Sequence, residues 1–154
     1  MVNQSWTQGF HNGIFFNYSI PWPESFFGCY NNDQASAYRA FFEGWADAVA
    51  SGDERNALNN TKAYFQNTGD ALFKKFEAAA NCEDLQQAQF NLNKAVGFDV
   101  HSAGFEEATF KFMEEHTDVY YDIFTKINGA FSLHGTINAG QLYANFIREV
   151  SRTI

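Results

Sequence analysis

The four histidines are the side chains best suited to metal binding or to acid–base chemistry near neutral pH. They are His11, His101, His116 and His134. We place His116 on the buried stripe of a predicted helix, where it would be either a metal or haem ligand or a core histidine bonded to a neighbour. A di-iron centre in a helical bundle requires Glu-x-x-His on two helices. His101, His116 and His134 all lack a glutamate three residues before them, so the core-histidine interpretation is favoured.

Acidic side chains are frequent around His116, but their spacing is that of a solvated helix face. They are Glu106, Glu107, Glu114, Glu115, Asp118 and Asp122. The chain has no calcium-binding loop, no Gly-x-Ser-x-Gly motif, and no phosphate-binding or dinucleotide-binding glycine loop. Cys82 has no assignable base beside it to make it a nucleophile. The sequence therefore indicates a protein that is not an enzyme, with no catalytic residue, metal ligand or cofactor assigned.

The two cysteines, Cys29 and Cys82, are the candidates for a disulfide. Cys29 precedes a helix predicted over residues 33–51, and Cys82 follows one predicted over residues 53–80. If these helices form an antiparallel hairpin, both cysteines lie at its open end. We therefore predict a Cys29–Cys82 disulfide, with two reduced and buried cysteines as the alternative.

Three Asn-x-Ser/Thr sequons bear on the compartment, with acceptors Asn3, Asn17 and Asn59. Together with the cysteine pair they favour an oxidising environment. We expect a protein of the extracellular space or the secretory-pathway lumen that can carry glycans. The alternative is a subunit of an organelle complex with reduced cysteines.

The elements that position these residues are predicted to be helices. From residue 31 onward there is no proline, and apolar residues recur at helical spacing. The expected helices cover residues 33–51, 53–80, 83–96, 103–128 and 139–152. Predicted caps are Asn32, Ser102 and an Asn138/Gln141 capping box at helix starts, and Gly52 and Gly97 at helix ends.

The predicted fold class is therefore all-α. We expect an antiparallel bundle of four to five helices over residues 31–154, preceded by an extended, aromatic-rich arm over residues 1–30. Gly9 and Gly13 are spaced four apart, so a short helix over residues 4–16 is the alternative for the first part of the arm.

Residues 10–30 concentrate the aromatic side chains and contain both prolines, Pro21 and Pro23. Polar residues interrupt this stretch, and no basic segment precedes it, so we do not expect a signal peptide or a membrane span. An extended segment cannot bury both of its sides on one bundle, and large exposed apolar patches usually mark interaction sites. We predict that the arm makes intermolecular contacts, and the candidate interface residues are Phe15, Phe16, Trp22, Phe26 and Phe27.

The composition argues against nucleic acid as a partner and is compatible with two classes of function. The net charge is −8 and no basic cluster occurs, so nucleic acid is not an expected partner. Charged residues are 18% of the chain, and such a surface resists self-association weakly. We expect a structural or assembly subunit of a filament, surface layer or larger complex, in contact with copies of itself or other subunits. The alternative is a helical carrier that encloses an apolar lipid or pigment.

Overall fold

The computed structural model describes residues 2–21, 30–68, 82–100, 102–132 and 136–154. Within these ranges the regular structure is α-helical apart from one 3-10 turn, and no strand occurs. The predicted helical class is confirmed, but these ranges contain more and shorter helices than expected. They are α1 (Val2–Asn17), α2 (Asn32–Ala50), the 3-10 turn η2 (Glu54–Asn56), α3 (Ala57–Thr68), α5 (Glu83–Val96), α6 (Ala103–Glu115), α7 (Thr117–Ser132) and α8 (Ile137–Ser151).

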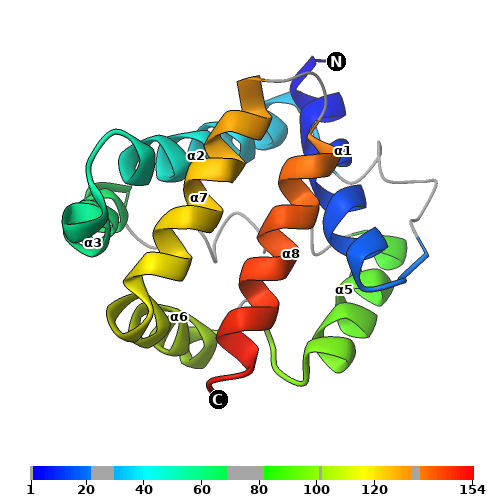
Figure 1. The fold of residues 1–154 in the computed structure, drawn as a ribbon. Coiled ribbons are helices and arrows are strands. Elements are labelled where there is room, and N and C mark those ends of the chain that lie inside the picture. The colour runs from blue at the N-terminus through cyan, green and yellow to red at the C-terminus, as the bar shows by residue number, and fades with distance from the viewer. Residues whose placement is uncertain (1, 22–29, 69–81, 101, 133–135) are drawn as a thin grey trace.

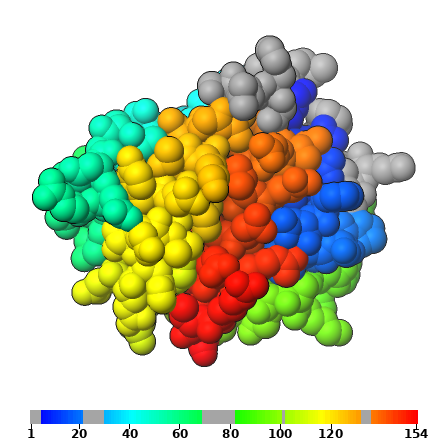
Figure 2. Space-filling model, in the orientation of Figure 1, coloured from blue at the N-terminus to red at the C-terminus, as the bar shows by residue number. Residues whose placement is uncertain are grey.

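Helix α8 runs through the middle of the molecule, with α7 on one side and α1 on the other (Figure 1). Helix α2 packs against α1, α3 and α7, while α6 packs against α7 and α8. In the space-filling view, α3 lies at one side of the visible face and α5 at the other (Figure 2). This central place agrees with the wide buried face of α8, which includes Ala139, Tyr143, Ala144, Phe146 and Val150.

The first and last described helices, α1 and α8, form the most extensive helix pair. Their direction is parallel, because Trp6 is bonded to Thr136 near the start of both helices and Asn17 to Arg148 near their ends. The expectation of antiparallel neighbours fails for this pair. Short connections impose antiparallel packing, and helices at the two ends of a chain share no such connection.

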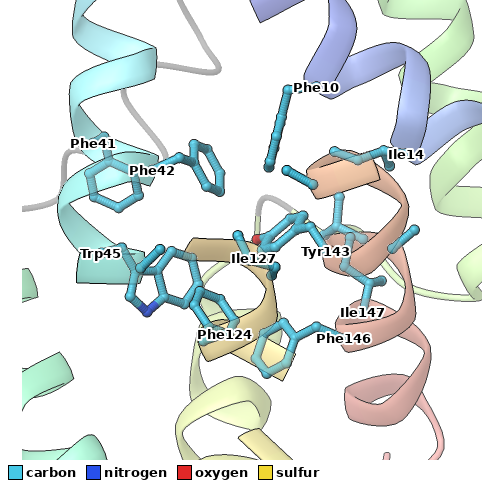
Figure 3. Packing of buried hydrophobic residues seen from close by; sticks show 14 of the residues in the cluster. Phe10, Ile14, Phe41, Phe42, Trp45, Phe124, Ile127, Tyr143, Phe146 and Ile147 are labelled. Carbon is cyan, nitrogen blue, oxygen red and sulfur yellow. The ribbon is translucent and has the colours of Figure 1, made fainter. Parts of the chain in front are cut away.

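The core is an aromatic cluster around Trp45 of α2. Its ring centroid lies 4.5 Å from that of Phe124 and 5.0 Å from that of Phe65. Figure 3 shows Phe10 of α1 and Tyr143 of α8 reaching the same cluster from the opposite side. Aromatic side chains bury about 150–250 Å² each, so this cluster supplies much of the apolar surface that folding removes from water.

Two helices begin and end close to where the sequence places them. The α5 bounds match the prediction, and Gly97 ends α5 with a φ of 85°, a left-handed conformation that favours glycine. Helix α2 is also as expected, but its cap is Asn31 rather than Asn32. The Asn31 side chain accepts from the Gln34 backbone N–H, and the Gln34 side chain accepts from the Asn31 N–H.

The helix predicted over residues 103–128 is interrupted at His116. Ser102 caps α6 as expected, but α6 ends at Glu115 and a new helix, α7, begins at Thr117. His116 has φ −132° and ψ 51°, which is not a helical conformation. In α7 the buried side includes Tyr120, Phe124 and Ile127, whereas Val119 and Ile123 are only half-buried.

Two further boundaries differ from the prediction. The helix expected over residues 53–80 begins with the η2 turn and continues as α3 to Thr68, and residues 69–81 lie outside the described ranges. Helix α8 begins after Thr136, whose side chain makes no capping hydrogen bond, so the predicted Asn138/Gln141 capping box is wrong.

The first part of the expected extended arm is the helix α1. It packs into the same core as the other helices, because Phe10, Ile14 and Phe15 are buried. Close contact with α8 depends on glycine: a Cβ on Gly13 would overlap the carbonyl oxygen of Ile137, and one on Gly140 would overlap that of Phe10. Residues 2–17 thus belong to the packed body of the protein, in line with the short-helix alternative.

Candidate functional site

A chain of buried hydrogen bonds joins α2, α7 and α3. The indole Nε1 of Trp45 donates to the hydroxyl of Tyr120 at 2.7 Å. The Tyr120 and Thr61 hydroxyls are also 2.7 Å apart, and Thr61 donates to the carbonyl of Ala57 at 2.7 Å. Because the Thr61 proton is directed to Ala57, Tyr120 donates to Thr61 and each donor in the chain has an acceptor. Burial raises the pKa of Tyr120, with the bonds to Thr61 and Trp45 opposing that shift.

A small cavity lies between α2, α3, α6 and α8. Its volume is about 20 Å³, and its lining includes Trp45, Phe65, Phe105, Met113 and Tyr143. That volume accommodates one water-sized molecule. Pockets for small organic ligands measure roughly 300–1,000 Å³. This cavity therefore gives no room for a lipid or a pigment without rearrangement of the surrounding rings.

A wide, open hollow of about 420 Å³ lies between α2 and α7. It is lined by Glu43 and Asp47 of α2 and by Asn128, Gly129 and Phe131 of α7. Glu43 is held in an ion pair with Arg39 at 2.9 Å. Among the described residues no group of three or more His, Cys, Asp or Glu side chains is arranged to hold a metal ion.

The histidines occupy different environments. His11 is buried in α1, where its Nδ1 lies 3.0 Å from the carbonyl of Thr7, which can only accept. Its ring is 4.8 Å from that of Tyr38. His116 is exposed at the end of α6, so its predicted burial is wrong and the helix interruption is the reason. His101 and His134 lie outside the described residues.

Arg148 of α8 closes the C-terminal end of α1. Its Nη2 donates to the backbone carbonyl of Asn17 at 2.7 Å, and its Nε donates to Asn17 Oδ1 at 3.0 Å. The guanidinium also lies 3.9 Å above the ring of Tyr18. A cation at this end offsets the negative pole of the α1 dipole. Partial burial raises the pKa of Tyr18 to about 12, although the nearby Arg148 and Arg152 cations lower it.

Asn17 is the residue through which this contact is made. Besides accepting from Arg148, its Nδ2 donates to the Gln141 carbonyl at 3.3 Å and to Asn145 Oδ1 at 3.2 Å. The sequence singled out Asn17 as a glycan acceptor and gave no signal for this bonding role. Asn59 is exposed on α3. The side chain of Asn3 lies outside the described part.

The predicted interface residues separate into different environments. Phe15 is 1% exposed and packs in the core, whereas its neighbour Phe16 is 67% exposed. Trp22, Phe26 and Phe27 lie outside the described residues. Sequence reasoning missed Phe90 of α5, which is 63% exposed. It could have been found, because Phe90 falls off the stripe of Leu85, Ala88 and Leu92 that the helical spacing identifies.

The structure describes only one of the two cysteines that we predict to form a disulfide. Cys82 is half-buried at the N-terminal end of α5 and packs against the core. Cys29 lies outside the described residues. The Cys29–Cys82 disulfide therefore stays a prediction.

Comparison with models of protein families, with curated proteins and with solved structures finds no match to this chain. In the described residues, no helix combines the length and the apolar character needed to cross a membrane.

Proposed function

We propose that this chain is a non-enzymatic assembly subunit that works in the extracellular space or the secretory-pathway lumen. It builds a filament, surface layer or larger complex by binding copies of itself or other subunits. The observation that carries this proposal is Phe16, which exposes 67% of its surface although most of the other described aromatic side chains are buried. Exposed aromatic side chains are typical anchors of protein interfaces.

The position of Phe16 supports a contact at this place. It lies one residue before the end of α1, and the chain then enters the segment that contains Trp22, Phe26 and Phe27. Phe15 is no longer included among the contact residues, because its side chain fills the core. Phe90 is added, because α5 and α1 lie on the same side of the molecule (Figure 1).

The compartment is proposed on the basis of the cysteine pair and the sequons. Disulfides form and persist outside the cell and in the secretory-pathway lumen, and asparagine sequons receive glycans in secreted proteins. The cavity beside Trp45 gives no support to the carrier alternative, because it accommodates only about one water-sized molecule.

Point substitutions test the contact better than deletion of residues 1–27, since that deletion would remove the core helix α1. We expect Phe16→Ser and Phe90→Ser to shift the sedimentation profile of the purified protein toward the monomer. A matched control is Ile154→Ser, which alters an apolar residue that is 57% exposed at the C-terminus. All three variants should keep the circular dichroism of the parent chain. A parent chain that sediments as a monomer at every concentration, or unchanged assembly in both Phe variants, would contradict the proposal.

A further inference from the structure

Two of the three sequon asparagines, Asn17 and Asn59, have described side chains, and the fold places them in different environments. The side-chain amide of Asn17 is engaged in hydrogen bonds to α8: its Nδ2 donates to Gln141 and Asn145, and its Oδ1 accepts from Arg148. Asn59 lies in the first turns of α3 with an exposed side chain. The nitrogen to which a glycan is attached is thus held by two hydrogen bonds to α8 on a half-buried side chain at Asn17, whereas the side chain of Asn59 is exposed to solvent.

We propose that Asn59 is an N-glycosylation site of this protein and that folded molecules carry no glycan on Asn17. This inference rests on the secretory setting of the proposed function. In the transfer, Asn59 Nδ2 bonds to the anomeric carbon of an oligosaccharide carried on a lipid diphosphate. The anomeric bond to the diphosphate breaks, the amide gives up one proton, and the lipid diphosphate leaves.

The burial of Thr61 determines whether the glycan is transferred to Asn59 before or after folding. Recognition of the sequon requires the hydroxyl of Thr61, but in the folded chain this residue is buried and its hydroxyl donates to Ala57 and contacts Tyr120. Glycan addition at Asn59 therefore precedes the packing of α3 on its neighbours. The fold then tolerates the product, because the glycan projects from an exposed position on α3.

The same order of events has the opposite result at Asn17. A sugar on its Nδ2 would occupy the space where Gln141 and Asn145 approach α1, so the α1–α8 contact could not close as it does here. Close approach of these helices also depends on Gly13 and Gly140, which leaves little freedom to move them apart. Chains modified at Asn17 should consequently be retained as misfolded material.

A glycan on α3 is compatible with the proposed assembly surface. Helix α3 lies on the opposite side of the molecule from α5 and the adjoining part of α1 in Figures 1 and 2. Phe16 and Phe90, the proposed contact residues, belong to α1 and α5. One side of the protein would thus carry the glycan, and the other would remain free to bind the next subunit.

The test is site mapping of the full chain expressed through a eukaryotic secretory pathway. Both the secreted and the cell-retained pools are digested with a glycosidase in heavy-oxygen water, which labels each formerly glycosylated asparagine. We expect label on Asn59 and none on Asn17 in the secreted pool. Asn59→Gln should abolish that glycan, while Asn60→Gln, which keeps the Asn-x-Thr pattern, should retain it.

Two variants separate the roles of Asn17. Ser19→Asn removes the sequon but leaves Asn17 and its bonds in place, and asparagine tolerates the φ of 59° found at Ser19. It should be secreted at the parent level, whereas Asn17→Gln should be retained. Label on Asn17 in the secreted pool, or no label on Asn59 in either pool, overturns the inference. The sedimentation profile reports assembly separately, so a failed glycan prediction and a failed assembly proposal are distinguishable.

Discussion

Tyr120 of α7 receives the indole N–H of Trp45 of α2 at 2.7 Å, inside the aromatic core. This contact connects two helices that are separated by 75 positions in the sequence. It gives a partner to a buried N–H group that would otherwise have lost its hydrogen bond to water, at a cost of about 1–3 kcal/mol. Loss of the Tyr120 hydroxyl oxygen alone should therefore lower the free energy of unfolding.

We expect Tyr120→Phe to lower the free energy of unfolding by about 1–3 kcal/mol, because it leaves the Trp45 N–H buried without a partner. Urea denaturation measures the change. The neighbouring Tyr121→Phe is the matched control, since the Tyr121 hydroxyl donates to Gly52 at 3.2 Å from a half-exposed position. Equal losses of unfolding free energy in the two variants would show that the buried hydrogen bonds of Tyr120 stabilise the fold no more than the half-exposed bond of Tyr121.

The α1–α8 crossing predicts opposite effects for two glycines. Gly140→Ala should destabilise the protein by about 1–3 kcal/mol or more, because the added methyl would overlap the backbone carbonyl of Phe10. Gly129→Ala in α7 should stabilise it by about 0.5–1 kcal/mol, because nothing lies within 4 Å of the added Cβ. Thermal unfolding of both variants provides the comparison, and a neutral Gly140→Ala would place the two helices further apart than described.

Arg148→Lys should cost about 1–2 kcal/mol of folding free energy. A lysine ammonium cannot bond to both the side chain and the carbonyl of Asn17 while stacking on Tyr18, as the planar guanidinium does. Arg152→Lys is the control, because its ion pair with Glu149 is exposed and should contribute little. Chemical denaturation of the two variants should separate them, and similar values would argue against the role of Arg148 at the end of α1.

Alkaline pH should unfold this protein cooperatively. Burial raises the pKa of Tyr30, Tyr38, Tyr120 and Tyr143 above the ordinary value of 10.0, and that of Tyr18 to about 12. Above pH 10 the unfolded chain loses these protons while the folded chain keeps them, so stability is full below pH 10 and falls as pH rises further. Absorbance at the tyrosinate band and circular dichroism should change together. Ionisation of all seven tyrosines near pH 10 with the helices intact would contradict this expectation.

The predicted Cys29–Cys82 disulfide should appear as one cross-linked peptide in non-reducing mapping. Closing a loop of this length contributes about 4 kcal/mol in the chain-entropy model. Reduction should therefore lower the melting temperature of the parent chain and leave the Cys29→Ser/Cys82→Ser double variant unchanged. Two free thiols in native material would remove the prediction and weaken the proposed secretory setting.

The sequence by itself determined the helical class and those helices whose start and end are marked by clear local signals. In α5, acidic residues at the start, a stripe of Leu85, Ala88 and Leu92, and Gly97 at the end all act within a few residues of each other. Such signals need no information from the rest of the chain. The same local logic identified Ser102 as a cap, and in α2 the aromatic residues Tyr38, Phe41 and Trp45, which recur at helical spacing, are all buried.

Only the tertiary structure decided which helices lie together and which polar residues their contacts use. No local rule places α1 parallel to α8, because the pair is formed by residues about 130 positions apart that approach through Gly13 and Gly140. The break at His116 replaces a continuous helix by two helices that follow different directions around the core. The sequence shows Asn17 only as part of a sequon, whereas the structure shows it as a hydrogen-bonding partner of Arg148. Hydrogen bonds between distant segments exist only once the chain has folded.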